Sequence, residues 1–393
     1  MELTERLESL KLGNTSTASI EALPFGILPS SHIQVGNVNR YLFRVFDEIS
    51  EGFNDKIWVR SRDARLSKHN WDIDIFARQD RVNIALMLSR HLWWEGKNDE
   101  EDNLVSWSSS LLVVLQYAFY RHRHYGIDLS AIFICVVDTS KLPKNVFVQD
   151  MNLIRKFSPL NSRLARMQDL RLSKHYYGEF LSQGELRIEG HCSIVSIEDI
   201  INVGLMRLRP EFEGFETRKP AWANEVVRLR QNDTDISGLL PIDDDHVRIA
   251  MHIGELFGKR WRLPVMISCL ALKPWQNIES QVMKALQQSE FEDFQTLITA
   301  LEEINYLAKA NLPEVMRGEK IMRMVYMNLR LDEAYLWAPS AEKKLRDVLL
   351  LLEREKLHDE SLSDYILATR ERFLEHLKAI TECTHALHEA LSN

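Results

Sequence analysis

The stretch from Asn103 to Ser140 constrains the fold most, because it is the most apolar part of the chain and yet carries four serines near its start. Leu104 to Ser108 is predicted to be a short strand. Ser109 or Ser110 is predicted to cap a helix that runs from Leu111 to about His124. Ala131 to Asp138 is an apolar run of strand length. The predicted order is therefore strand, polar turn, helix, strand.

The length and charge of the chain limit its class. At 393 residues it exceeds one ordinary hydrophobic core, so two or three structural units are expected. A net charge of −8 argues against general binding to nucleic-acid backbones. The four cysteines lie far apart without a Cys-x-x-Cys pair, which fits a reducing compartment and offers neither a disulfide framework nor zinc-site spacing. No metal site is expected.

The N-terminal segment and the apolar runs indicate an intracellular protein. The first residues, MELTERLESL, are acidic where a secretory signal is basic, and no apolar core region follows them. The longest apolar runs, such as Leu111 to Tyr120, are shorter than the roughly 20 residues that span a bilayer. We therefore expect a cytoplasmic or nuclear protein without membrane contact.

Turn-forming residues and hydrophobic spacing divide the chain into four segments. Residues 1–36 mix Ser, Thr, Gly and Pro and are predicted to be a loosely ordered leader. Residues 37–215 are expected to form an α+β domain, and 216–275 a boundary with connecting helices. Residues 276–393 carry apolar seams at helical spacing and are predicted to form a helical bundle, which would hold a protein partner or a second copy of the chain.

Two helices are predicted from their periodicity. From Asp80 to Trp94, apolar residues recur at helical spacing and are expected to pack on a sheet; they are Val82, Leu86, Ser89 and Trp93, with Ala85 and Leu88 beside them. Further on, three aspartates precede an apolar helix that begins near Val247. They are expected to cap that helix, because an aspartate before an apolar-periodic segment is far more often a cap than a metal ligand.

Three places in the N-terminal half are polar where the pattern predicts apolar residues. Arg44 lies in the middle of the apolar strand predicted from Arg40 to Asp47. A guanidinium there must meet a carboxylate, a group of carbonyls or an anionic ligand, because leaving it dry and unpaired costs several kcal/mol. The other two places are a serine-rich strand end with Ser106 and Ser108, and a later strand with Glu179, Gln183 and Glu185.

In this order, an arginine, a serine-rich strand and a glutamate, the residues resemble the layout of ADP-ribosyltransferases. The resemblance implies an α+β fold with a split mixed sheet and flanking helices that binds NAD, followed here by an α-helical C-terminal region. It implies that Arg44 holds a phosphate of NAD and that Ser106 and Ser108 shape the nicotinamide pocket. The catalytic glutamate would bond the 2′-hydroxyl of the nicotinamide ribose.

Two glutamates fit the catalytic position of that family. Glu179 follows a glycine and leads into Phe180 and Leu181, much as the family's catalytic glutamate leads into an apolar strand. Glu185 ends the sequence Gln-Gly-Glu, which fits the Gln-x-Glu loop of some toxin-like members and places Gln183 in the cofactor site. Glu179 is preferred. Either glutamate also has an arginine nearby in the sequence, Arg171 or Arg187, with which it would form a surface ion pair.

The roles that the resemblance implies for these residues agree with the chemistry of cleaving NAD. Breaking the nicotinamide–ribose bond builds positive charge on the ribose, and a fixed carboxylate beside it stabilises that charge. Arginine suits a pyrophosphate because its planar fork bonds two oxygens at once. This interpretation requires Arg44, Ser108 and Glu179 to converge on one cleft, although they lie far apart in the sequence.

A second resemblance covers about residues 38–275. The stretches LVSWSSSLLVVLQYAFY, GEFLSQGEL and ELFGKRW are similar to those of an uncharacterised family of filamentous-fungal proteins. That resemblance implies a fungal cytosolic or nuclear protein and brings no activity.

The function expected from the resemblance to ADP-ribosyltransferases is transfer or cleavage of ADP-ribose from NAD. The alternatives are a catalytically inactive binding or scaffolding protein, or an accessory protein of a fungal pathway, with partner contacts through the C-terminal helices.

Overall fold

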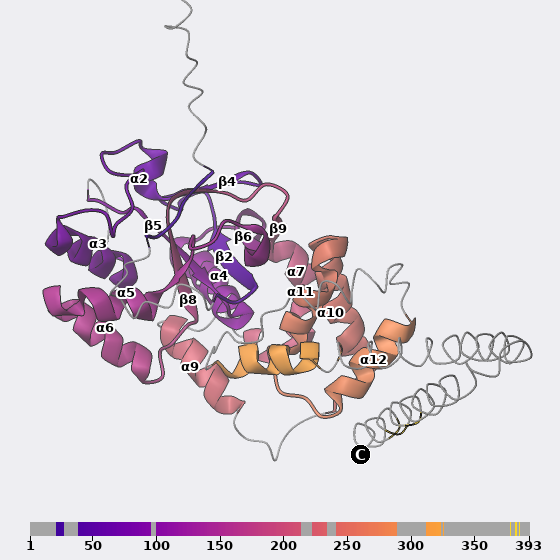
Figure 1. Ribbon diagram of the computed structural model, residues 1–393. Coiled ribbons are helices and arrows are strands. Elements are labelled where there is room, and N and C mark those ends of the chain that lie inside the picture. Colours follow the sequence, from indigo (N-terminus) through magenta and orange to yellow (C-terminus); the bar gives the residue numbers. More distant parts are fainter. Residues whose placement is uncertain are drawn as a thin grey trace, which may run out of the picture. The chain divides into compact units, whose positions relative to one another are not determined.

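The computed structural model describes part of the chain (Figure 1). The described residues are 21–26, 38–95, 100–213, 222–233, 241–288 and 312–323, with the single positions 325, 378, 382 and 385. The chain divides into two compact units, Met1–Glu290 with Glu303–Met322, and Phe291–Glu302 with Arg323–Asn393. Almost all described residues belong to the first unit. Most of the helical bundle predicted for 276–393 lies outside the described residues.

A curled antiparallel sheet lies at the centre of the first unit (Figure 1). Its strand order is β3-β4-β8-β5-β2-β6-β9, and β1 and β7 also pair with β8. The strands are β1 Ala22–Leu23, β2 Tyr41–Phe46, β3 Phe53–Asn54, β4 Trp58–Arg60, β5 Leu104–Ser108, β6 Phe133–Asp138, β7 Val148–Gln149, β8 Glu179–Arg187 and β9 Cys192–Ser196. Two of these strands agree closely with prediction, β2 and β5.

The α+β class is confirmed, but the expected mixed sheet is wrong, because every pair between the described strands is antiparallel. The chain does pass from β5 through a helix to β6, a connection that would give two neighbouring parallel strands. Instead β2 lies between β5 and β6 and pairs antiparallel with both. Strand β2, which precedes β5 in the chain, therefore lies between β5 and β6, the two strands that this helical connection joins.

The sheet is nearly divided between β2 and β5. Strand β2 pairs with β6 along its whole length, from Tyr41 to Phe46, and β5 pairs with β8 from Leu104 to Ser108. Between β2 and β5, in contrast, the structure has a single residue pair, Phe43 with Ser108. Beyond this pair the two strands separate, which leaves backbone carbonyls of β5 available to side chains.

The helices cover the sheet and continue beyond it. They are α2 Arg62–Arg65, α3 Arg81–Trp93, α4 Leu111–Tyr125, α5 Asp150–Phe157, α6 Ser162–Leu172, α7 Ile197–Val203, α8 Leu205–Leu208, α9 Trp222–Asn232, α10 Asp244–Leu256, α11 Arg262–Leu270 and α12 Ile278–Gln288. A further helix spans 313–323. Figure 1 shows α3, α5 and α6 together on one side of the strands. None of the described helices is long and apolar enough to cross a membrane.

Helix α3 packs only in part with the face predicted, because Ala85 and Leu88 are buried as expected whereas Val82 and Leu86 are exposed. Its buried residues include Ile84, Leu88 and Leu92, which share a core cluster with Leu104 of β5 and with residues of α5, α6 and β8. Val82, which was expected to pack on the sheet, is 64% exposed. The helix is therefore rotated relative to the prediction, because the sheet and the helices α5 and α6 all pack against its apolar residues. This rotation turns His91 toward β5.

Local sequence signals agree with the structure at several helix ends. The Ser110 side chain caps α4, and Gly126 ends that helix in the left-handed conformation that glycine favours. The Asp243 side chain caps α10, as expected of the three aspartates. Two segments are more ordered than their composition suggested, because α9 lies within the predicted boundary and Phe25, in the predicted leader, is buried.

Gly184 lets β8 change partners. Up to Gln183 the strand pairs with β5, and from Glu185 it pairs with β4. Gly184 itself has a φ of +62°, a conformation that L residues with a side chain rarely adopt. A Cβ atom at this position would lie 2.9 Å from the Trp71 carbonyl oxygen. Both the backbone conformation and the space therefore require glycine.

We expect Gly184→Ala to lower the free energy of unfolding by about 2–3 kcal/mol, because it adds a steric clash to the cost of the left-handed backbone. Gly190→Ala is the matched control: Gly190 has a φ of +72°, but a Cβ atom there meets nothing within 4 Å. The control should cost only about 1 kcal/mol. Urea unfolding followed by circular dichroism measures both, and equal losses would contradict the steric part of the argument.

Candidate functional site

A cavity of about 660 Å³ opens where β2 and β5 separate. Residues from β2, α3, β5, α4, α6, β8 and α9 contribute to its wall. Four of the six predicted site residues line it, namely Arg44, Ser106, Ser108 and Glu179. Residues from three adjacent strands thus share one hollow.

Arg44 enters this cavity from the opposite face of the sheet. It leaves β2 on the side of Leu42 and Phe46, whereas Ser108 pairs with Phe43 and therefore points the other way, as does Ser106. The side chains of Arg44, Ser106 and Ser108 reach one cavity only because the sheet opens between β2 and β5. The convergence expected from the sequence thus depends on the gap in the sheet.

The guanidinium of Arg44 is held by neutral groups. Its Nη1 donates to the Ser106 carbonyl oxygen at 2.8 Å, and its Nε donates to the Asn54 side-chain oxygen at 2.8 Å. Among the described residues no carboxylate forms an ion pair with it. Burial lowers the pKa of Arg44 to about 10, so it stays charged at neutral pH. Of the possible partners named from the sequence, Arg44 meets a carbonyl oxygen, and in the described part of the chain its charge has no carboxylate partner.

Glu179 is fixed by two donors. The Ser106 hydroxyl donates to its Oε1 at 2.7 Å, and the Arg171 guanidinium binds its Oε2. The predicted pairing of Glu179 with Arg171 is therefore correct, but the pair is buried rather than on the surface, with side chains 12% and 5% exposed. Its orientation at the cavity wall is consequently well defined.

Arg171 also forms an ion pair with a second carboxylate, that of Asp150. Its Nε lies 2.9 Å from Oδ2 of Asp150, the first residue of α5. Burial, followed by repulsion from Glu179, raises the pKa of Asp150 to about 7, although Arg171 acts in the opposite direction. One guanidinium thus compensates two carboxylates, and the second of these takes up a proton more readily than an ordinary aspartate.

On its other side, Ser106 contacts His91. The imidazole Nε2 lies 2.8 Å from the Ser106 hydroxyl, and Nδ1 lies 2.9 Å from Oδ1 of Asp102. Burial by itself would lower the pKa of His91, but Asp102 and Glu179 outweigh it and raise the pKa. Neither His91 nor Asp102 was predicted as a site residue. His91 lies three residues after Leu88 and seven after Ile84, so its place on the buried stripe was the available signal.

Aromatic rings form another part of the wall. Trp94 stacks on Trp222 with ring centroids 4.8 Å apart and an interplanar angle of 13°. Tyr177 lies 4.9 Å from Trp222, and Tyr117 lies 4.9 Å from Trp94. Such surfaces stack on flat rings of a ligand. Trp222 belongs to α9, so this wall includes a helix that the sequence had assigned to a boundary segment.

The lining carries more positive than negative side chains. Among the described residues it contains six arginines, Arg44, Arg60, Arg62, Arg90, Arg121 and Arg171, and three carboxylates, Glu51, Asp102 and Glu179. Five of these arginines form an ion pair with a carboxylate, such as Arg121 with Asp47. The excess of positive charge favours an anionic ligand, and Arg44 is the arginine best placed to meet it.

Two predicted site residues lie away from the cavity. Glu185 pairs with Arg60 at 2.9 Å, and it is absent from the described lining. Gln183 is buried and bridges backbone and side-chain groups of the Pro24 and Asp74 regions. Glu185 lies beyond the change of partner at Gly184, where β8 pairs with β4, and Gln183 pairs with Leu104 of β5 and with Leu23 of β1.

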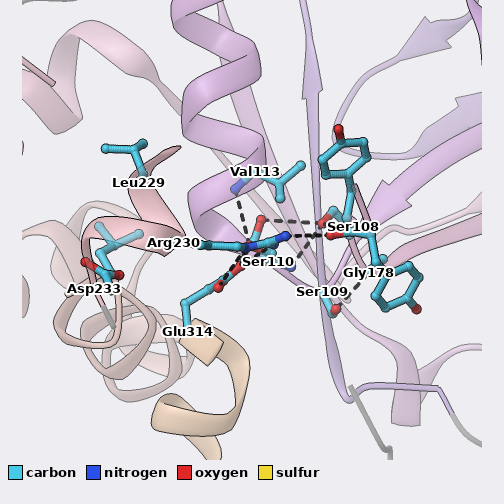
Figure 2. Close-up of polar contacts among 12 residues, drawn as sticks. Ser108, Ser109, Ser110, Val113, Gly178, Leu229, Arg230, Asp233 and Glu314 are labelled. Atoms are coloured by element: carbon cyan, nitrogen blue, oxygen red, sulfur yellow. Dashed lines mark hydrogen bonds and ion pairs between the residues drawn. The ribbon is translucent and has the colours of Figure 1, made fainter. Parts of the chain in front are cut away.

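The serines after Ser106 hold the end of β5 in place (Figure 2). The Ser108 hydroxyl donates to the Tyr177 carbonyl oxygen at 2.7 Å and accepts from the Ser110 backbone N–H at 3.0 Å. Ser109 bonds the carbonyl of Gly178 through its backbone N–H at 2.9 Å. These bonds position Glu179, the residue that follows Gly178. The hydroxyl proton of Ser108 is thus already engaged within the protein.

Ser110 connects this turn to a distant segment (Figure 2). Its hydroxyl donates to Glu314 at 2.5 Å, and Arg230 of α9 binds the same carboxylate through Nη2 at 2.6 Å. Burial would raise the pKa of Glu314, but Arg230 and Ser110 outweigh it and lower the pKa. Arg230 also donates to the Tyr176 carbonyl. The helix at 313–323 is thereby fastened to both strands that carry the site.

Comparison with known proteins finds one similarity, to a family model that covers part of the chain. The model of a domain of unknown function, DUF7587, matches residues 37–199. This range contains the five residues at the centre of the cavity, Arg44, His91, Asp102, Ser106 and Glu179. It excludes Trp222, Arg230 and Glu314. No curated protein and no solved structure gives a significant match to the chain.

The described residues contain no group of three or more histidine, cysteine, aspartate or glutamate side chains arranged to hold a metal ion. The cavity wall offers arginines, carboxylates, hydroxyls and aromatic rings. Together these groups suit recognition of a molecule that combines an anionic group with flat rings.

The buried ion pair between Arg230 and Glu314 gives a test of the connection to the distant helix. We expect Glu314→Gln to lower the free energy of unfolding by about 3 kcal/mol, because it leaves a buried guanidinium without a counterion. Glu95→Gln is the control, since Glu95 and Arg163 form an exposed pair. Urea unfolding should show little change for the control. A loss for Glu314→Gln no larger than for the control would contradict the proposed anchoring.

Proposed function

We propose that the cavity binds NAD and that Glu179 assists cleavage of the bond between nicotinamide and ribose, so that ADP-ribose is transferred to an acceptor or released into water. The observation that carries the proposal is that Arg44, which has no carboxylate partner among the described residues, and an oriented carboxylate, Glu179, line the same hollow. NAD requires both, a cation for its phosphates and an anion for the ribose that becomes positive.

The dimensions and walls of the cavity support this ligand. A volume of about 660 Å³ lies within the range of roughly 300–1,000 Å³ that is usual for cofactor sites. Trp94, Trp222, Tyr117 and Tyr177 provide surfaces for the adenine or nicotinamide ring. Fixed groups such as Ser106 and Glu179 then set the orientation of the remaining part.

The arrangement of strands supports the reaction class. Arginine, serine and glutamate occur on β2, β5 and β8, which are neighbours in the sheet, and the cavity lies where the sheet separates. This is the layout that the resemblance to ADP-ribosyltransferases implies. When the bond to nicotinamide breaks, its electron pair leaves with nicotinamide. Glu179, held by Ser106 and Arg171, stabilises the positive charge left on the ribose.

A catalytically inactive binding protein is the second candidate. It is favoured by the ion pair between Glu179 and Arg171, which already compensates the charge of the carboxylate. Such a protein would bind NAD without releasing nicotinamide, and would use other surfaces to contact a partner.

Glu179→Gln tests the enzymatic function. We expect the purified full chain to release nicotinamide from NAD, and the substitution to lower kcat by about 100-fold or more, because the amide no longer stabilises positive charge. Glu185→Gln is a matched control on the same strand, since Glu185 itself is absent from the described lining, although its partner Arg60 belongs to it. It should leave kcat within about twofold. Stabilisation of the wild-type chain by NAD without nicotinamide release would favour the binding protein instead.

Arg44→Met tests the binding of an anion. The substitution removes the cation that has no carboxylate partner in the described part of the chain, so we expect the Kd for NAD, measured by isothermal titration calorimetry, to rise at least tenfold, or about 1.4 kcal/mol. The melting temperature without NAD shows whether the variant folds. Arg163→Met, which changes an exposed arginine outside the described lining, should leave the Kd unchanged. Equal affinities for Arg44→Met and the wild type would exclude a phosphate contact.

A further inference from the structure

A continuous chain of hydrogen bonds leads from Asp102 through His91 and Ser106 to Glu179. Oδ1 of Asp102 lies 2.9 Å from His91 Nδ1, and His91 Nε2 lies 2.8 Å from the Ser106 hydroxyl. The Ser106 hydroxyl lies 2.7 Å from Oε1 of Glu179. All four side chains line the cavity. The resemblance to known transferases accounts for Ser106 and Glu179, but it assigns no role to His91 or Asp102.

The number of protons fixes the direction of this chain. An ionised carboxylate only accepts hydrogen bonds, so the single proton of Ser106 points to Glu179. The contact between Ser106 and Nε2 then requires a proton on Nε2, and the contact with Asp102 requires one on Nδ1. With both carboxylates ionised, the three contacts together require a proton on each ring nitrogen, which makes His91 an imidazolium. A neutral ring would leave one of the three short contacts without a proton.

The surroundings of His91 favour the charged ring. Asp102, which precedes β5, and Glu179 on β8 are the carboxylates that face it, and Arg44 on β2 opposes them. His91 also lies in the last turn of α3, where the helix dipole favours a cation. Behind Glu179, Arg171 of α6 and Asp150 of α5 complete the set of buried charges.

We propose that His91 is a positioning residue: aligned by Asp102, its imidazolium donates to Ser106, which turns the Ser106 proton toward Glu179 and holds that carboxylate in one orientation at the cavity wall. The effect on turnover rests on the function proposed above, whereas the hydrogen-bond chain itself does not. In this arrangement His91 does not act as the base of a serine nucleophile, because Nε2 carries a proton and Ser106 donates its own to Glu179.

The proposal has a definite pH dependence. Because the pKa of His91 is raised above its ordinary value, the imidazolium persists to a higher pH than in a free histidine and is lost as the pH rises through the raised pKa. Nε2 then becomes an acceptor, and Ser106 turns its proton from Glu179 to His91. Activity that depends on an oriented Glu179 therefore falls on the alkaline side.

The protonation of His91 can be measured without any assay of activity. In the full chain labelled with ¹⁵N-histidine, we expect the His91 signal, identified by its loss in His91→Gln, to show two N–H protons at pH 7. Asp102→Asn should make this histidine titrate at a lower pH, because the main charge that raises its pKa is removed. A neutral His91 ring at pH 7, with one N–H proton, would overturn the proposal.

Two substitutions at His91 separate positioning from mere packing in the NAD cleavage assay. His91→Leu removes the donor, so kcat should fall about 100-fold while KM stays within about threefold. His91→Gln keeps an N–H donor that does not titrate, so part of kcat should return and the alkaline decline should disappear. His122→Gln, on α4 and outside the described lining, should retain the wild-type profile.

The outcomes distinguish this proposal from the proposed function. An unchanged kcat and alkaline decline in His91→Leu would overturn the positioning role of His91. If no variant and no wild-type sample releases nicotinamide, the proposed enzymatic function fails, and the NMR measurement alone decides on the hydrogen-bond chain. Covalent labelling of Ser106 by a fluorophosphonate would show that it acts as a nucleophile, and would also overturn the proposal.

Discussion

The single residue pair that joins β2 to β5 determines the rest of the site. Full pairing of these strands would have used the backbone groups of β5 for the ladder and closed the gap in the sheet. Because the strands separate after Phe43 and Ser108, the carbonyl of Ser106 is available to Arg44. A buried guanidinium needs such acceptors. The gap in the sheet, the placement of Arg44 and the cavity are therefore consequences of one limited contact.

The cavity wall is also organised by alternation of charge. Carboxylates and proton donors follow one another along a path that links α5, α6, β8, β5 and α3, through Asp150, Arg171, Glu179, Ser106, His91 and Asp102. Each carboxylate in this path faces a guanidinium, an imidazole or a hydroxyl, which offsets the cost of removing it from water. The same compensation fixes the orientation of Glu179. Stability and a preorganised site thus arise from the same contacts.

The sequence predicted those features that depend on local periodicity and capping. Strand β5, helix α4 with its cap at Ser110, and helix α10 with its cap at Asp243 follow from residues adjacent in the chain. The buried face of α3 was not predictable in this way, because it depends on what packs against the helix, and His91 was overlooked for the same reason. The antiparallel character of the sheet depends on the insertion of β2, which no local pattern encodes. The chemical roles of Arg44 and Glu179 stay predictions.

The attachment of Glu314 has a practical consequence for work with shortened proteins. The range matched by the family ends within α7, whereas Ser110 and the backbone of Tyr176 reach their partners only through α9 and the helix at 313–323. A fragment cut at the family boundary would open this polar junction to solvent directly behind the strands that carry the site. Recombinant fragments intended for crystallisation or ligand screening should therefore extend at least to residue 323.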